Sequence, residues 1–391
     1  MIGHLCKLVW NRKRANGLIV AEIFVSFLIL SAVATLGVYT LDTYRQSLGY
    51  SYENIWALHI STKNDPQRAA TLQQVYTAIR SMEEIEGFAG VSHSAIPYGS
   101  SSSRRDIEYQ GRSIMVPTTT AADDFAEVAD LQLLDGRWFE EGDEVLNWDP
   151  VVINQRLSWE LFGAENPLGK NIAPSDRTKE MRVVGVISDF RKDGEFAGLG
   201  NFLFQRMALN TAPTRPTLLL KVRPGATTLF EERLVSTLQS LAKDWSFKLE
   251  TLKRTRAASH QQHLALLSGV VVISAFLMLM VGLGLVGVLW QSVVQRTEEL
   301  GLRRALGATG SGVRRQVVGE LLALTSISTV FGLAVALQFP LLGVIGFVSG
   351  KVYIYGLALS LLLMYSLVVL CGLYPSWLAT RVQPAQALHY E

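Results

Sequence analysis

Four long apolar stretches constrain this chain more than any other feature of its sequence. They cover residues 17–41, 264–290, 321–347 and 352–377 and are separated by polar segments. Each reaches the roughly 20 apolar residues that a helix needs to cross the ~30 Å hydrocarbon core of a bilayer. With 49% hydrophobic and 18% charged residues, the chain is too apolar for an average soluble protein and too polar for a continuous membrane bundle. The sequence therefore predicts four membrane helices and one large polar domain.

Positive charge is distributed unevenly around these stretches. Basic residues precede the first stretch, lie between the second and third, and follow the fourth, whereas the connection between the third and fourth carries only Lys351. Because cytoplasmic loops are enriched in lysine and arginine, residues 1–16, 291–316 and 378–391 are expected in the cytoplasm, and residues 42–263 outside it. The net charge of +2 is small and dispersed, so it gives no indication of nucleic-acid binding.

The start of the chain also resembles a secretory signal peptide. A basic segment and an apolar stretch are followed by Ala32-Val33-Ala34, a candidate cleavage site. The apolar stretch continues past this site to Leu41, which makes it long enough to span the membrane. We therefore expect residues 17–41 to be retained as the first membrane helix.

Residues 42–263 have the pattern of an α+β domain. Two blocks, at residues 55–96 and 217–252, alternate β-type and helical runs and are expected to form the halves of one porter-like lobe. Residues 104–190 contain short strand candidates and turns, which predicts an inserted β-rich lobe. The Gly- and Ser-rich residues 97–103 provide a hinge into it. Both cysteines of the chain fall outside this domain, so it has to be stable without disulfide bonds.

The individual elements of the two blocks can be placed from the same pattern. Expected strands cover residues 55–60, 90–96, 217–222 and 247–252, and expected helices cover residues 66–82 and 227–241.

A charged segment between the second and third membrane helices is the most informative part of the chain for function. It runs from Arg296 to Ala308, and Glu299 and Arg303 form an i, i+4 pair in the favourable order before a helix stop at Gly307. A helix lying passively on anionic lipid is one interpretation. The mixed acidic and basic residues argue against it, since such a helix would carry only Lys and Arg on its polar face. We therefore predict a compact cytoplasmic element that receives force from a soluble partner.

A second helix is expected to follow this element and to lead into the third membrane helix, residues 317–347. Thr309 or Ser311 can cap its N-terminus, because a side-chain oxygen at that position accepts a hydrogen bond from a free backbone N–H.

Residues 163–170 resemble a phosphate-binding loop only superficially. Ala164 stands where the loop needs glycine, and Asn171 stands where it needs a hydroxyl to reach magnesium. We expect a turn of the outer domain here, and neither an ATPase site nor a cofactor of the chain's own. His260 and His263 share a helical face without further ligands at a zinc-like spacing, so a solvated face is expected there and no metal site.

Glu22 is a carboxylate within the first membrane helix. Such a group costs ~2.5 to 3.5 kcal/mol at the helix centre unless it is paired or protonated, which makes it a functional candidate. It lies about two turns beyond Arg14. Hydrogen bonding between helices, or proximity to the interface, is favoured over a role in proton transfer.

Several of these segments together resemble a known family. Residues 296–308 strongly resemble the segment between the second and third spans of MacB/FtsX-like ABC transporter permeases, and residues 374–388 resemble that family's C-terminal signature. Three motifs in the outer domain are similar to those of the MacB-type periplasmic core domain: Gly136-Arg137-Trp138-Phe139, Asn166-Pro167-Leu168-Gly169-Lys170 and Val183-Val184-Gly185-Val186. The resemblance covers nearly the whole chain.

The resemblance implies one half of a type VII ABC transporter, which dimerises through its membrane helices with a second copy or a paralogue. MacB carries an ATPase domain ahead of its first span, whereas only residues 1–16 precede the span here, so we expect a separate ATPase subunit that binds ATP and magnesium. The resemblance also implies that residues 254–264 form a stalk that transmits motion. It places Gly301 and Gly307 as shape-setting residues among the ATPase-coupling residues Arg296, Glu298, Glu299, Gly301, Arg303, Arg304 and Gly307.

The expected function is therefore a non-catalytic, mechanotransmitting permease subunit in the bacterial inner membrane. It would expel an amphipathic compound, a peptide or a lipidated molecule from the outer side of the membrane. One alternative is an FtsX-like regulatory scaffold that activates a cell-wall hydrolase, although outer domains in that family are typically much smaller. Another is a lipoprotein-extracting subunit. A periplasmic adaptor as a further partner would indicate tripartite efflux.

Overall fold

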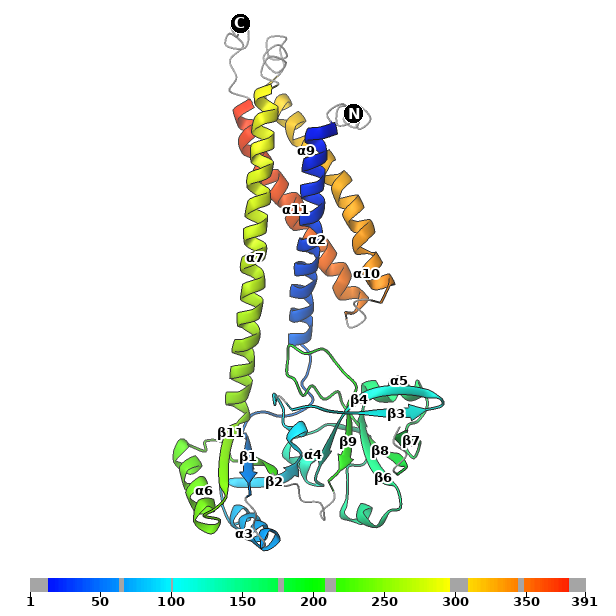
Figure 1. Ribbon diagram of the computed structural model, residues 1–391, viewed down its shortest axis with the longest axis vertical. Coiled ribbons are helices and arrows are strands. Elements are labelled where there is room, and N and C mark those ends of the chain that lie inside the picture. The colour runs from blue at the N-terminus through cyan, green and yellow to red at the C-terminus, as the bar shows by residue number, and fades with distance from the viewer. Residues whose placement is uncertain are drawn as a thin grey trace. The chain divides into compact units, whose positions relative to one another are not determined.

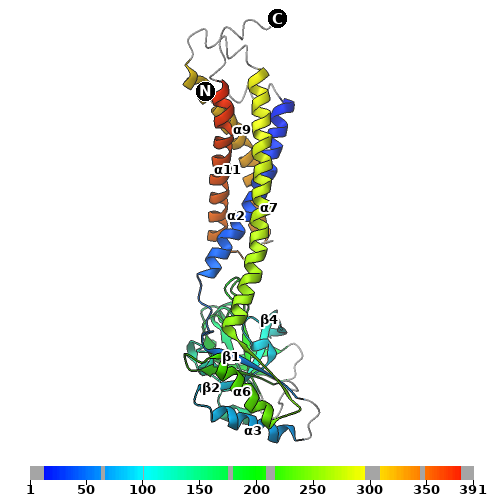
Figure 2. The ribbon, with the colours of Figure 1, turned by 90° about the vertical axis from the view of Figure 1, so that its left-hand side faces the viewer.

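The computed structural model describes residues 13–62, 67–99, 101–174, 179–207, 216–295, 309–343 and 348–379. The chain divides into two compact units. One contains Met1–Asp42 together with Leu264–Glu391, and the other contains Thr43–His263. Helices make up the first unit and a mixed sheet with short helices makes up the second (Figures 1 and 2).

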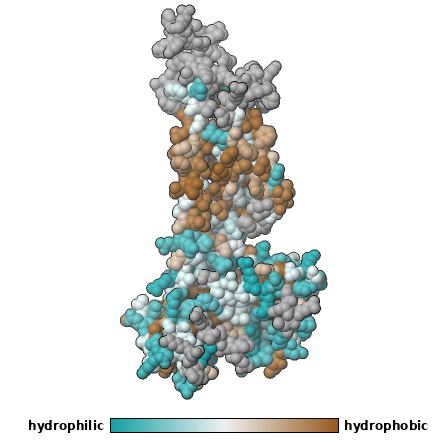
Figure 3. Space-filling model, in the orientation of Figure 1, coloured by the Kyte–Doolittle hydropathy of each residue, from teal (hydrophilic) through white to brown (hydrophobic). Residues whose placement is uncertain are grey.

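Within the described residues, four helices are long and apolar enough to cross a membrane. They are α2 (Lys13–Tyr44), α7 (Leu252–Gln295), α9 (Gly310–Ala336) and α11 (Gly350–Ala379), and the short helix α10 (Gln338–Leu341) follows α9. Apolar side chains dominate the visible surface of these helices (Figure 3), as expected of surface that lipid covers. The prediction of a four-helix membrane protein with an α+β domain is confirmed.

The third membrane helix ends earlier than the apolar stretch in the sequence. The stretch continues to residue 347, but α9 ends at Ala336 and only α10 follows it within the described residues. Pro340 explains the break, because its ring clashes with the carbonyl four residues earlier and it has no N–H to donate there. That carbonyl belongs to Ala336, and it accepts a hydrogen bond of 2.5 Å from the Tyr353 hydroxyl instead.

The membrane helices pack around a core in which α2, α9 and α11 are the most buried. About a third or more of the most apolar window of each of these helices is buried, compared with 6% of the corresponding window of α7. Small residues allow close approach: a Cβ atom at Gly332 would overlap Phe27, and one at Gly356 would overlap Thr35. The apolar face of α7 is therefore the least covered of the four.

One lobe of the second unit is a four-stranded antiparallel sheet with two helices on one face. The strand order is β11 (Ser246–Thr251), β1 (Ile55–Ser61), β10 (Thr217–Val222) and β2 (Ile85–Val91). The helices α3 (Arg68–Arg80) and α6 (Thr228–Leu241) bury Val75, Ile79 and Leu234 against Leu58 and Leu220. This is the split β-α-β arrangement. The two sequence blocks thus interleave to form a single lobe, as expected.

The second strand lies earlier than predicted. It was expected at residues 90–96, but β2 covers Ile85–Val91 and His93–Ala95 form a 3-10 turn, η1. Gly87 and Gly90 weaken the strand signal in the sequence because glycine has no side chain to pack. In the fold, pairing with β10 along the length of β2 compensates for that weakness.

The inserted lobe continues the same sheet through β4. It contains β3 (Ser103–Tyr109), β4 (Arg112–Ala121), α4 (Phe125–Val128), β5 (Leu133–Gly136), η2 (Glu141–Val145), β6 (Asp149–Asn154), α5 (Gln155–Phe162), β7 (Asn171–Pro174), β8 (Met181–Ile187) and β9 (Leu203–Arg206). The pairing of Val91 with Ala121 joins it to the first lobe. The insertion was expected to end near residue 190, but β9 belongs to it because this strand pairs with both β4 and β6.

Candidate functional site

The predicted ATPase-coupling residues lie outside the described residues. They are Arg296, Glu298, Glu299, Gly301, Arg303, Arg304 and Gly307, and the structure describes α7 up to Gln295 and α9 from Gly310. The boundary of α9 agrees with the sequence. Of the two capping residues considered, Thr309 occupies the N-cap, and its hydroxyl oxygen accepts a hydrogen bond of 3.3 Å from the N–H of Gly312.

Glu22 lies between two membrane helices. Its side chain extends from α2 to the backbone of α7, where a Cβ atom at Gly284 would overlap the carboxylate. Only glycine leaves room for the carboxylate at that place, since any larger residue would force it away. The carboxylate thus lies between two helices, and both hydrogen bonding between helices and a role in proton transfer stay predictions.

The segment that resembles a phosphate-binding loop forms a turn of the inserted lobe. Gly163 ends α5 with a positive φ of 60°, and Lys170 forms an ion pair with Glu165. The N–H of Gly169 donates to the carbonyl of Val183 at 2.8 Å. A backbone amide that bonds within the sheet is not available to a phosphate, so the expectation of a turn is confirmed.

The three outer-domain motifs meet at one point of the sheet. Gly136 pairs with Gly185 across β5 and β8, and the N–H of Arg137 donates to the carbonyl of Val184 at 3.0 Å. A Cβ atom at Gly185 would overlap the carbonyl of Arg137, and one at Gly136 would overlap Leu168 of the motif at residues 166–170. The glycines are therefore required for close backbone packing. These motifs hold the inserted lobe together.

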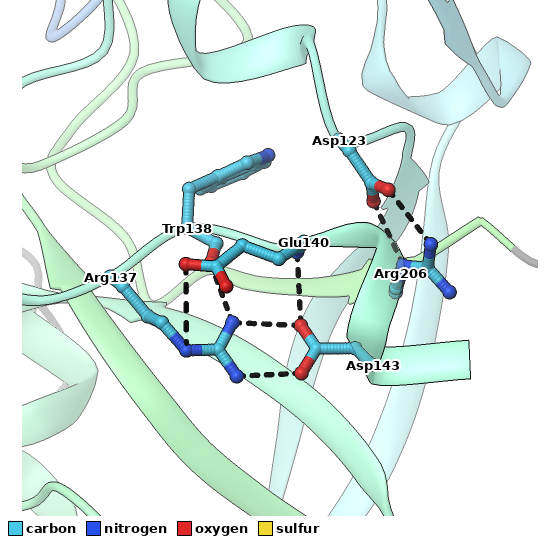
Figure 4. A network of polar contacts seen from close by, with 6 residues as sticks. All are labelled: Asp123, Arg137, Trp138, Glu140, Asp143 and Arg206. Atoms are coloured by element: carbon cyan, nitrogen blue, oxygen red, sulfur yellow. Dashed lines mark hydrogen bonds and ion pairs between the residues drawn. The ribbon is translucent and has the colours of Figure 1, made fainter. Parts of the chain in front are cut away.

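An ion pair between the partly exposed Arg137 and the buried Asp143 extends from this point (Figure 4). The guanidinium of Arg137 binds the carboxylate of Asp143 through two hydrogen bonds of 2.6 and 2.8 Å, and Asp143 also accepts 3.0 Å from the N–H of Glu140. Burial raises the pKa of Asp143, but the hydrogen bonds from Arg137 and from Glu140 outweigh burial and hold the pKa below its usual value. Asp143 is therefore an ionised group that fixes the segment after β5.

A second ion pair ties the neighbouring strands. Arg206, at the end of β9, binds Asp123 through two hydrogen bonds of 2.7 and 2.8 Å. The indole N–H of Trp138 donates a hydrogen bond of 3.2 Å to the carbonyl of Ala122, the residue before Asp123. These contacts connect the ends of β4 and β9 with the segment after β5.

The two histidines of α7 are not on a solvated face, so that prediction is wrong. His260 Nε2 lies 2.9 Å from Glu195 Oε2, and the His263 ring lies against Phe196 with 5.1 Å between ring centroids. Residues 191–197 cover this face of the helix. The sequence gives no local signal for the contact, because Arg191-Lys192-Asp193-Gly194-Glu195 has the composition of an exposed loop although its Arg191, Lys192 and Glu195 are buried.

Comparison with known proteins identifies two family models. The model for the MacB-like periplasmic core domain matches residues 17–236, and that for the FtsX-like permease C-terminal region matches residues 271–384. Solved structures of related outer domains align with modest scores. The periplasmic region of MacB from Actinobacillus actinomycetemcomitans gives a TM-score of 0.39 at 19% identity and covers 53% of this chain and 92% of that one.

Three relatives illustrate the range of similarity. The macrolide export ATP-binding/permease protein MacB of Aggregatibacter actinomycetemcomitans is 28% identical over 227 residues, which are 54% of this chain and 33% of that protein. The pyoverdine export ATP-binding/permease protein PvdT of Pseudomonas aeruginosa is 26% identical over 68% of this chain and 41% of its own length. The uncharacterized ABC transporter permease YknZ of Bacillus subtilis is 23% identical over 84% of this chain and 82% of its own.

The chain thus spans less than half of the two ATP-binding/permease proteins and most of the permease YknZ. The two family models together cover most of the outer domain and at least part of each of the four apolar helices, and the first alone covers over half of the 391 residues. The protein is a multi-pass protein of the bacterial inner membrane. It belongs to the MacB/FtsX-like family of ABC transporter permeases.

Proposed function

We propose that this protein is the mechanotransmitting permease subunit of an ABC transporter. In this proposal, ATP hydrolysis by a separate ATPase subunit moves the outer domain, and the movement expels an amphipathic compound, a peptide or a lipidated molecule from the outer side of the membrane. The observation that carries the proposal is the continuity of α7.

Helix α7 is one helix of 44 residues that starts directly after strand β11 and includes the residues expected to form a stalk. At 1.5 Å per residue it is about 65 Å long, roughly twice the hydrocarbon thickness of a bilayer. It contains no proline, the most common cause of a helix break. An uninterrupted helix of this length can transmit a push or a rotation from one end to the other.

The outer end of α7 is firmly attached to the sheet. Strand β11 pairs with β1 over six residue pairs, from Trp56 with Thr251 to Ser61 with Ser246. Leu252, the first residue of α7, is 1% exposed and packs in the core shared by the two lobes. A displacement of α7 would therefore move β11 and the sheet with it. At its other end, α7 is followed in the chain by the proposed coupling segment, residues 296–308.

We infer that ATP and magnesium bind to the partner ATPase and that this chain has no catalytic site of its own. In the turn at residues 163–170, the N–H of Gly169 bonds to the sheet, and those of Glu165 and Lys170 bond to nearby carbonyls of the chain, which supports this inference. The names of MacB and PvdT describe them as ATP-binding/permease proteins, so an ATPase that acts on this type of permease fits the family. The sparsely covered α7 offers a surface to a second copy or a paralogous permease.

The proposed substrate class follows from the relatives. MacB is named for macrolide export and PvdT for pyoverdine export, so molecules of that kind, or an amphipathic peptide or lipidated molecule, are the first substrates to test. Since force would act on the outer domain, the substrate need not cross the membrane through this chain. A periplasmic adaptor would be a further partner if the substrate continues to an outer-membrane channel.

The coupling segment provides the direct test. We expect the double variant Glu299→Lys with Arg303→Glu to insert normally but to lose association with the partner ATPase, measured by co-purification, and ATP-driven export from proteoliposomes. The exposed pair is worth only ~0.3 to 0.5 kcal/mol within a helix, so its reversal is too small an effect to unfold the protein. Lys351→Glu, a charge reversal at an exposed position in the first turn of α11, is the matched control. Wild-type association and export in the double variant would refute the proposal.

A further inference from the structure

One loop of the outer domain holds both points at which the chain enters and leaves that domain. The second unit begins at Thr43, in the last turn of α2, and ends at His263, in the first part of α7. Residues 191–197, which we call the clasp, follow β8 and bond to both ends. All of the contacts described here lie within the second unit.

Arg191 binds the end of α2. Its side chain is buried, and its guanidinium donates hydrogen bonds of 2.7 Å to the carbonyl of Thr43 and 3.1 Å to the carbonyl of Gln46. The last carbonyls of a helix have no partner within the helix and carry a partial negative charge, so a fixed cation is favoured there. The same guanidinium donates to the carbonyls of Glu195 and Ala197 and so fixes the shape of the clasp.

Glu195 binds the start of α7. Its carboxylate accepts a hydrogen bond of 2.6 Å from Nε of Arg256 and lies 2.9 Å from Nε2 of His260. These two side chains are one turn apart on α7. The Glu195 carboxylate also accepts a hydrogen bond of 3.1 Å from the hydroxyl of Tyr98. Burial raises the pKa of Glu195, but the hydrogen bonds from His260 and Arg256 outweigh burial and hold the pKa below its usual value.

Phe196 adds an apolar contact to both helices. Its ring lies between Tyr44 at the end of α2 and the two histidines of α7, with centroid distances of 5.7 Å to Tyr44, 5.1 Å to His260 and 5.1 Å to His263. Adjacent residues of the clasp therefore use charge, hydrogen bonds and ring packing on the same two chain ends.

The clasp also reaches the segment that leads into the inserted lobe. The buried ammonium of Lys192 donates to the carbonyls of Gly99, at 3.1 Å, and Ser101, and the carbonyl of Lys192 accepts 2.8 Å from the N–H of Tyr98. These residues belong to the predicted hinge at residues 97–103. The clasp thus connects three segments that are far apart in the sequence: the end of α2, the hinge and the start of α7.

Burying three charged side chains in one short loop is costly unless the charges are satisfied, and apolar residues of similar size would fill the same space at lower cost. Charged hydrogen bonds have stricter geometry than apolar contacts. An arrangement of this kind is suited to holding two helices in a defined relation, because a small displacement of either helix breaks its directional bonds.

We propose that the clasp is the joint through which a displacement of α7 reaches the end of α2 and the inserted lobe, with Glu195 as its central positioning residue. This inference rests on the proposed function, in which α7 carries the motion. Without the clasp, the attachment of α7 to the domain through β11 and the buried Leu252 would remain, but its bonds to the end of α2 and to the hinge would be lost.

The first measurement needs no ATPase. In the full-length protein in nanodiscs, we expect Glu195→Gln to raise the amide hydrogen-exchange rates of residues 252–263 about tenfold or more, since a hydrogen bond to a charged group is lost. Tyr98→Phe removes one hydrogen bond and should give a smaller increase. Glu250→Gln, which alters a more exposed carboxylate in β11, is the control and should leave these rates unchanged. Wild-type rates in both Glu195→Gln and Tyr98→Phe would overturn the clasp.

The second measurement tests transmission. With the partner ATPase in proteoliposomes, we expect Glu195→Gln to retain ATP hydrolysis but to export several-fold less substrate per ATP, a ratio that simple loss of folded protein would not change. An unchanged ratio would overturn the joint, even if exchange rates rise. Failure of the proposed function has a different signature, because the wild-type protein itself would then show no ATP-driven export.

Discussion

A single methyl group decides whether the three outer-domain motifs can pack together. A Cβ atom at Gly185 would overlap the carbonyl of Arg137, whereas one at Gly142 has no atom within 4 Å. We expect Gly185→Ala to destabilise the outer domain by about 1 to 3 kcal/mol because β5 and β8 have to separate. Its melting temperature would fall by several degrees, at ~2 to 4 °C per kcal/mol for a domain of this size.

Scanning fluorimetry of the full-length protein in nanodiscs measures this shift. Gly142→Ala is the matched control and should melt within a degree or so of the wild type, as expected for a substitution at an open surface position. Equal melting temperatures for Gly185→Ala and the wild type would contradict the close packing of the motifs.

The ion pair of Arg137 and Asp143 predicts how stability depends on pH. The folded-state pKa of Asp143 lies below its ordinary value, so the pair contributes stability at neutral pH, and that contribution is lost as pH falls below about 4, through the lowered folded pKa. Asp143→Asn should be less stable than the wild type at pH 7 and should lose less stability on acidification. Denaturant unfolding at a series of pH values tests this, and parallel profiles would show that Asp143 does not titrate in this way.

The helices were predictable from the sequence to different degrees. Apolar length identified all four membrane helices, and the capping rule gave Thr309 as one of two candidates for the N-cap of α9. The end of α9 at Ala336 follows from Pro340, because the proline ring disrupts the helix at the carbonyl four residues earlier. Strand β2 was displaced because its glycines weaken the local pattern, while its partners β10 and β4 come from distant parts of the sequence.

Residues of the candidate site were also predictable from the sequence to different degrees. Glu22 was found because a carboxylate is expensive in a membrane, which is a property of the residue alone. Glu195 was missed because its importance comes from Tyr98, Arg256 and His260, which are distant in the sequence. A single sequence gives composition and local periodicity, and such long-range partners leave no mark on either.

Helix α7 provides a prediction about rigidity. Proline within a helix removes a hydrogen bond and kinks the helix at a cost of ~3 kcal/mol or more, whereas proline in the first turn is tolerated. The hydroxyl oxygen of Thr251 caps α7 by accepting a hydrogen bond of 3.2 Å from the N–H of Arg254. Lys253 therefore lies in the first turn of α7, and Ala265 lies well inside the helix. We expect Ala265→Pro to retain ATP hydrolysis in the presence of the partner ATPase but to lose most ATP-driven export.

The matched variant Lys253→Pro places the same residue in the same helix, at an exposed position where no intrahelical bond is lost. It should export substrate at nearly the wild-type rate. Comparable export by Ala265→Pro would mean that α7 does not have to be continuous, and the mechanical role proposed for it would then be wrong.

The direction in which force would travel depends on the orientation of the whole chain in the membrane. Basic residues around Arg14 and Arg303 predict that residues 42–263 are outside and residues 291–316 inside. In a protein with Cys6 and Cys371 replaced by serine, single cysteines at Ser102 and Gly312 occupy exposed positions on the two predicted sides. In right-side-out vesicles, a membrane-impermeant maleimide should label Ser102→Cys in intact vesicles and Gly312→Cys only after permeabilisation. Labelling of both cysteines from the same side would exclude the four-span topology, because α7 is the one candidate span between Ser102 and Gly312 in the part of the chain that the structure describes, and a single crossing places the two sites on opposite sides of the membrane.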